Sequence, residues 1–120
     1  MRLLLMMPLL ALGACATVET QREHQPVFTG STLNTADQVY ACFYNRMIHM
    51  PRLRYRAREH GGTIRGRRGF FARYVNLVID IDDIGPARRV VVHASDSSRR
   101  LYPESIAELQ TCLQQQPAAG

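Results

Sequence analysis

The sequence has no apolar run long enough to cross a membrane as a helix, and it has no lysine. Its longest apolar run, residues 3–12, is about half of the roughly 20 residues that a spanning helix needs. All 15 basic residues are arginines, and the net charge is +5. The first absence argues against a spanning helix. The second leaves a small basic chain whose cationic side chains, histidines aside, are all guanidinium groups.

Motifs of common enzyme chemistry are also missing. The glycines of residues 61–69 are not followed by the Gly-Lys-Ser/Thr of a P-loop. The four histidines lack helical metal-ligand spacing, and the three aspartates within residues 80–83 lack the glycine and glutamate of a calcium loop. His93, Ser95 and Asp96 lie too close in sequence to converge as a triad. We therefore expect no catalytic residue, no metal and no cofactor, and thus no enzyme.

The N-terminus has the pattern of an export signal. Arg2 precedes the apolar run, and small residues follow it. Residues 12–15 read Leu-Gly-Ala-Cys and resemble the lipobox of bacterial lipoproteins. This resemblance implies that Cys15 becomes the first mature residue and is acylated, and that Ala16, which is not aspartate, directs sorting to the outer membrane on its periplasmic side. Two or more acyl chains would hold the protein stably. An ordinary signal cut after Ala16, leaving a soluble periplasmic protein, is the alternative.

This interpretation divides the chain into four parts. Residues 1–14 form the signal peptide, and residues 15–34 form a lipidated cysteine with a flexible tether that could reach about 60 Å. Residues 35–116 form one α+β domain, and residues 117–120 form a disordered tail. The cysteines left in the domain, Cys42 and Cys112, meet an oxidising compartment, so we expect a disulfide. Two buried free thiols are the alternative.

Apolar periodicity predicts the elements of the domain. A helix starts at Thr35, where Thr35 and Gln38 fit a capping box, and it ends at Pro51. Alternation predicts strands over residues 52–58, 70–82 and 88–95, whereas residues 63–69 form a short strand or an irregular link. A second helix starts at Pro103. The predicted fold is a two-layer α+β sandwich, in which both helices cover one face of a three- or four-stranded antiparallel meander.

This layout resembles small uncharacterised lipoproteins of Gram-negative bacteria. The shared features are a lipobox, a short tether, a cysteine-bearing helix, a meander and a final helix with a second cysteine. The resemblance implies a location and a disulfide, and it brings no known activity.

Arginines alternate with Leu53, Tyr55 and Ala57 along the first predicted strand. If the helices cover the face with Leu53, the arginines stand on the other face, where they form an anion-binding surface. Its predicted members are Arg52, Arg54, Arg56, Arg58, Arg65, Arg67 and Arg68, continued by Arg73. The alternative is a solvated face that Asp80 and Asp82 partly neutralise.

These features favour a non-enzymatic accessory domain of the outer membrane. Its predicted partners are the membrane, through acylated Cys15, and lipopolysaccharide phosphates, the cell wall or an acidic envelope protein. Export argues against nucleic acid, although residues 65–74 interleave arginine with aromatic residues. The alternative function is an inhibitor or regulator of an exported hydrolase, which would use residues 59–69 as a loop.

Overall fold

The computed structural model describes residues 18–23, 25–48, 52–68, 74–94 and 102–114, which form one five-stranded sheet and three helices. The predicted α+β class is confirmed, but the sheet has five strands, not three or four. The helices are α1 (Val18–Arg22), α2 (Ala36–Arg46) and α3 (Tyr102–Gln114), and the strands are β1 (Phe28–Thr32), β2 (Leu53–Arg58), β3 (Gly61–Arg68), β4 (Tyr74–Ile84) and β5 (Ala87–Ala94).

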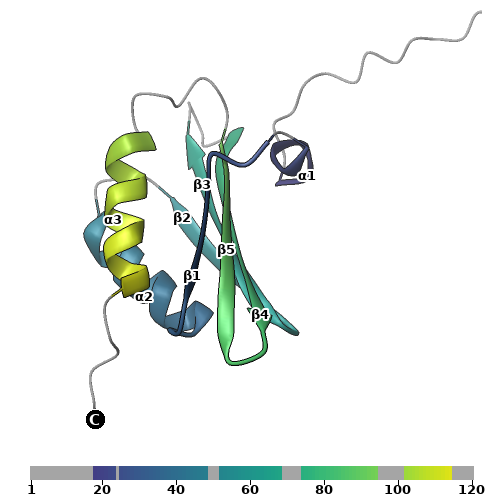
Figure 1. The fold of residues 1–120 in the computed structure, drawn as a ribbon. Coiled ribbons are helices and arrows are strands. Elements are labelled where there is room, and N and C mark those ends of the chain that lie inside the picture. The colour runs from purple at the N-terminus through teal and green to yellow at the C-terminus, as the bar shows by residue number, and fades with distance from the viewer. Residues whose placement is uncertain (1–17, 24, 49–51, 69–73, 95–101, 115–120) are drawn as a thin grey trace, which may run out of the picture.

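The sheet is a meander with one added edge strand. Its order is β1-β5-β4-β3-β2, and every neighbouring pair is antiparallel. Helices α2 and α3 lie side by side on one face, as expected, whereas the short helix α1 lies on the other face (Figure 1). We call these the α2/α3 face and the α1 face. The strands β2 and β1 form the two edges.

The prediction that residues 15–34 form a flexible tether is wrong in two segments. Residues Phe28–Thr32 form β1, which pairs with β5, so that the domain starts well before residue 35. On the α2/α3 face, β1 offers Phe28, Gly30 and Thr32. A Cβ at Gly30 would lie 2.9 Å from the ring of Phe28 and 3.4 Å from Leu113. A larger residue there would displace the Phe28 ring and would also lie against Leu113 of α3.

The second correction is α1, which docks on the sheet instead of forming part of a flexible linker. It packs over β4 and β5 (Figure 1). Its Gln21 is buried, and two residues of the sheet that point to this face, Val78 and His93, are buried as well. The described part of the chain is therefore folded from Val18 onward, within the segment that was expected to be a tether.

The core lies between the sheet and the pair α2 and α3. The apolar stripe predicted for α2 is buried through Val39, Phe43 and Met47, with Cys42 partly buried beside it. Alternation along β4 and β5 is as expected, with every second residue in the core. The buried core residues of these two strands are Leu77, Ile79, Ile81, Val90, Val92 and Ala94.

The N-terminus of α2 has the predicted capping box. The Gln38 amide donates to Thr35 Oγ1 (3.2 Å), and the Thr35 amide donates to Gln38 Oε1 (2.8 Å). The helix ends at Arg46, with Met47 as C-cap, which is earlier than the expected stop at Pro51. Helix α2 therefore ends four residues before the last residue that precedes Pro51, and Pro51 itself lies outside the described residues.

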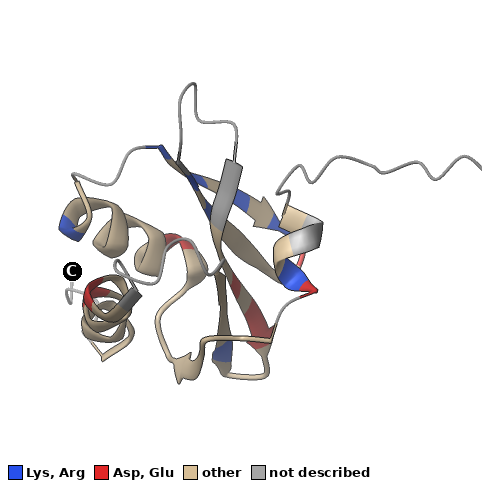
Figure 2. Cartoon of the chain, turned by 90° about the horizontal axis from the view of Figure 1, so that it is seen from above, with Lys and Arg blue, Asp and Glu red and all other residues tan. Residues whose placement is uncertain are grey.

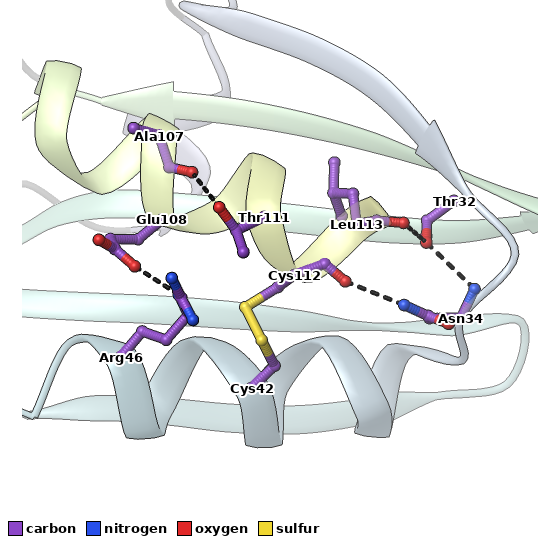
Figure 3. Close-up of a disulfide and its surroundings, with 9 residues drawn as sticks. All are labelled: Thr32, Asn34, Cys42, Arg46, Ala107, Glu108, Thr111, Cys112 and Leu113. Carbon is purple, nitrogen blue, oxygen red and sulfur yellow. Dashed lines mark hydrogen bonds and ion pairs between the residues drawn. A yellow bond between two sulfur atoms is a disulfide. The ribbon is translucent and has the colours of Figure 1, made fainter. Parts of the chain in front are cut away.

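Figure 3 shows how α2 and α3 are joined. The predicted disulfide between Cys42 and Cys112 is present, with Cα atoms 5.7 Å apart. Asn34 Nδ2 donates to the carbonyl of Cys112 (2.9 Å), and Thr32 Oγ1 donates to that of Leu113 (2.7 Å). Carbonyls in the last turn of a helix have no partner within the helix, so these side chains supply the missing donors. The C-terminal end of α3 is thereby fixed to α2 and to the end of β1.

The glycine-rich segment after β2 forms a strand, with a β-bulge between Gly66 and Arg67. β3 is eight residues long, and a two-residue turn at Glu59 and His60 joins it to β2. A Cβ at Gly62 would come within 2.4 Å of the Tyr55 ring, so the glycine makes room for an aromatic side chain from the neighbouring strand. The expected loop of residues 59–69, on which the hydrolase-inhibitor hypothesis relied, is therefore mostly strand.

Candidate anion-binding face

The arginines of β2 lie on the α1 face, as alternation predicted. Leu53 is buried and Tyr55 half-buried on the opposite side, whereas Arg54, Arg56 and Arg58 are exposed. Basic residues occupy β2 and β3, and acidic residues occupy the half of β4 that leads to β5 (Figure 2). The α1 face therefore has a basic side and an acidic side.

At the acidic side, Asp80 is the centre of an ion-pair network that includes α1. Arg22 donates to both carboxylate oxygens of Asp80, from Nη2 at 2.7 Å and from Nε at 2.9 Å. Arg22 also donates to Thr63 Oγ1 (3.2 Å), and Thr63 in turn donates to Asp80 Oδ1 (2.8 Å). Two-pronged arginine–carboxylate pairs are strong and directional. This contact holds α1 on the sheet.

Arg58 belongs to the same network and is the only arginine of β2 with an ionic partner among the described residues. Its Nη2 lies 2.8 Å from Asp82 Oδ1 and 3.7 Å from Asp80 Oδ1, and it donates to the Gly62 carbonyl at 3.0 Å. For Arg58, the alternative interpretation of a neutralised sheet face is therefore correct. This arginine contributes to the fold and is not free for a ligand.

The network lowers the pKa of Asp80. Burial alone would raise it, but the hydrogen bonds from Arg22 and Thr63, together with the charges of Arg22 and Arg58, outweigh the effect of burial. Asp80 is thus ionised throughout the neutral range and stays so into moderate acid.

At the basic side, two arginines face each other without a counter-ion. Arg54 of β2 and Arg65 of β3 are directly opposite in the strand register, and the next residue across the sheet is the apolar Val78. Among the described residues, no hydrogen bond or ion pair involves the side chains of Arg54, Arg56 or Arg65. Side chains directly opposite in antiparallel strands lie about 5 Å apart at Cβ, and like charges there destabilise a sheet. We call these three residues the arginine cluster.

The other predicted members of the anion-binding surface are not equivalent to this cluster. Arg52 lies in the turn before β2 with φ 64°, a conformation that non-glycine residues rarely adopt. Arg67 follows a β-bulge and is half-buried, and its Nε is buried without a hydrogen-bond acceptor. Arg68 is the last residue of β3, its side chain is not described, and Arg73 lies outside the described residues.

Sequence reasoning missed Arg22, which it assigned to the tether. A five-residue helix is too short to show a 3.6-residue apolar period, and its partner Asp80 is 58 residues further along the chain. The residues next to Arg22 in the sequence gave no signal for this pairing.

In the described parts of the chain, no group of three histidine, cysteine or acidic residues is placed to hold a metal ion, and no helix is long and apolar enough to cross a bilayer. Of the three residues considered as a triad, His93 is buried under α1, and residues 95 and 96 are outside the described ranges. No protein-family model matches the chain, and comparison with curated proteins and with solved structures finds no significant match.

Proposed function

We propose that this protein is an exported, lipid-anchored binding domain whose arginine cluster holds the phosphate groups of membrane lipids. The observation that carries the proposal is the pair Arg54 and Arg65, which face each other and form no ion pair among the described residues. Such a pair costs stability in the absence of an anion, and a phosphate between the two guanidinium groups would offset that cost.

The position of α1 supports a lipid surface as the source of the phosphate. If Cys15 carries the acyl chains, as the lipobox resemblance implies, it lies only three residue steps from Val18, where α1 starts. Three residues span at most about 10 Å. Because α1 is docked on the same face as the arginine cluster, this face would be held close to the lipid headgroups, which a tether of about 60 Å would not require.

The two contributions differ in size and purpose. Buried acyl chains contribute about 0.8 kcal/mol per methylene, which makes the anchor nearly irreversible. Each basic side chain near an anionic surface adds only about 1 kcal/mol. The acyl chains would therefore keep the protein on the membrane, and the arginine cluster would set which face it turns toward the lipid.

The anchor is tested on the full chain expressed in a Gram-negative host. We expect a mature protein that begins at Cys15, carries fatty acyl chains by intact mass spectrometry and fractionates with the outer membrane. A Cys15→Ser variant should lose both properties. A mature chain without fatty acid would overturn this half of the proposal.

The arginine cluster is tested with the unacylated Cys15→Ser protein and vesicles. Binding to vesicles of phosphatidylcholine with 30% phosphatidylglycerol (about one lipid in three, as a strongly anionic surface) should exceed binding to phosphatidylcholine alone and should weaken with salt. Arg54→Gln/Arg65→Gln should reduce it. The control Arg46→Gln/Arg88→Gln removes the same charge at two positions away from the α1 face and should have little effect. Equal losses in both variants, or binding to isolated cell wall and not to vesicles, would refute a lipid-phosphate site.

A further inference from the structure

The strand β2 leaves one edge of the sheet open. It is the last strand in the order, and no described strand pairs with its outer side. The exposed N–H and C=O groups of such an edge can accept a further strand. The other edge strand, β1, packs against α3, as β2 packs against α2.

Beside this open edge, α2 presents an apolar stripe. Tyr40 and Tyr44 lie one turn apart on the flank of the helix turned away from Cys42 and from α3, and Ile48 follows in the turn after the helix. Tyr44 is 49% exposed and Ile48 70% exposed, so the stripe presents apolar surface to solvent. The stripe therefore extends the apolar surface of the core past β2, the edge strand of the sheet.

The stripe and the start of β2 enclose an open groove of about 490 Å³. Its lining is mixed. The stripe, Met47 and Leu53 supply its apolar part, and Arg52 and Arg54 contribute to its polar part. The Tyr40 ring stacks on Tyr55 of β2 with centroids 5.0 Å apart. Burial, together with hydrogen bonding to Asp37 and its negative charge, raises the pKa of Tyr55 to about 12, so this ring remains neutral beside the groove.

A second copy of the chain does not suit this edge. Two β2 strands paired with each other would bring the arginines of one copy against those of the other. Of these arginines, only Arg58 has an ionic partner within the described residues. Charged residues on edge strands prevent this kind of self-association. The same charges attract a strand of opposite sign.

The side chains of an added strand would alternate between two environments. Side chains on one face of the added strand would lie over the groove, against the stripe. Side chains on its other face would lie beside Arg54 and Arg56 on the α1 face. We propose that the outer edge of β2 binds an extended polypeptide segment in which apolar and acidic residues alternate. This site goes beyond the lipid-phosphate function, because it uses the groove and the backbone of β2, which that function does not need.

The test uses the full Cys15→Ser chain and three synthetic peptides of eight residues. The first alternates valine and glutamate, the second has the same composition in two blocks, and the third alternates valine and lysine. Calorimetry should show binding of the first peptide about tenfold tighter than that of the block peptide, and no binding of the lysine peptide. Equal affinity for the alternating and block peptides would overturn the proposal.

Variants separate this site from the arginine cluster. Tyr44→Ser/Ile48→Ser should weaken binding of the valine–glutamate peptide about tenfold and leave vesicle binding unchanged. Arg65→Gln should do the opposite, since Arg65 lies one strand away from the edge. Ile84→Ser, which changes an exposed isoleucine at the distant β4–β5 turn, is the matched control and should alter neither.

Hydrogen exchange tests the mode of binding. An added strand should slow exchange of amides in β2, at alternate residues, because only every second N–H of an edge strand points outward. Peptide binding that depends on Arg54 but leaves β2 exchange and the Tyr44→Ser/Ile48→Ser variant unaffected would mean that the arginines attract the peptide only as an anion. That result would refute strand addition while leaving the lipid-phosphate function standing.

Discussion

The two faces of the sheet are held in different ways. On the α2/α3 face, apolar side chains are buried and one disulfide joins the two helices. On the α1 face, a short helix is held by charged hydrogen bonds at the acidic side, and arginines stand unpaired at the basic side. On the α2/α3 face, strand alternation alone indicates which residues are buried. On the α1 face, the role of an arginine depends on which residue lies opposite to it on the neighbouring strand.

The largest effect is expected on the α2/α3 face. Cys42→Ser/Cys112→Ser opens a loop closed over a sequence separation of 70 residues. In the chain-entropy model, this lowers the free energy of unfolding by about 4 kcal/mol. Urea unfolding of variant and wild type measures the loss, which should be the same at low and high salt. A loss that depends strongly on salt would mean that the two faces are coupled.

A smaller effect is expected on the α1 face. Asp80→Asn replaces one of the two oxygens that accept from Arg22 with a donor group, and it removes the negative charge that attracts Arg22 and Arg58. Hydrogen bonds to charged groups contribute about 2 kcal/mol, so we expect a loss of that order by urea unfolding. The control Asp83→Asn breaks a more exposed pair with Arg88 and should cost below about 1 kcal/mol. Similar losses in both would show that α1 is not held through Asp80.

The extent of successful prediction follows the same division between the faces. Parity and periodicity predicted the α2/α3 face, including the capping box of α2, the buried stripes and the disulfide. They missed β1, because only Phe28 is strongly apolar among its inward residues, and Gly30 reflects space left for α3. They also missed α1, because its docking depends on Arg22 meeting a carboxylate from a distant strand. The local sequence around a residue does not indicate which residue of a distant strand it will contact.

Acid should weaken the α1 face selectively. The pKa of Asp80 is lower in the folded state than its ordinary value near 3.9, so its contribution is fully present above that value and is lost as the pH falls through the folded pKa. The stability difference between wild type and Asp80→Asn should therefore be constant from pH 7 to about 5 and shrink toward pH 2. Urea unfolding at several pH values measures it. A difference that grows on acidification would contradict the lowered pKa.

The smallest expected effects compare one arginine at the acidic side of the α1 face with one arginine at its basic side. Arg58→Gln removes contacts with Asp80 and Asp82 and should lower the free energy of unfolding by up to about 1 kcal/mol. Arg65→Gln removes one of two like charges directly opposite each other and should raise it by a few tenths of a kcal/mol, about the lower limit for a cross-strand pair. Both variants lose one positive charge, so a general effect of net charge would shift them in the same direction.

We expect the free energy of unfolding to fall in Arg58→Gln and to rise in Arg65→Gln. If Arg65→Gln also binds vesicles more weakly, the arginines of the basic side lower the stability of the fold and bind an anion. Two arginines retained at the expense of the fold are then explained by a ligand, whereas Arg58 is explained by the fold alone. If Arg65→Gln destabilises the protein as much as Arg58→Gln does, Arg65 is also structural, and the difference between the two sides of the α1 face disappears.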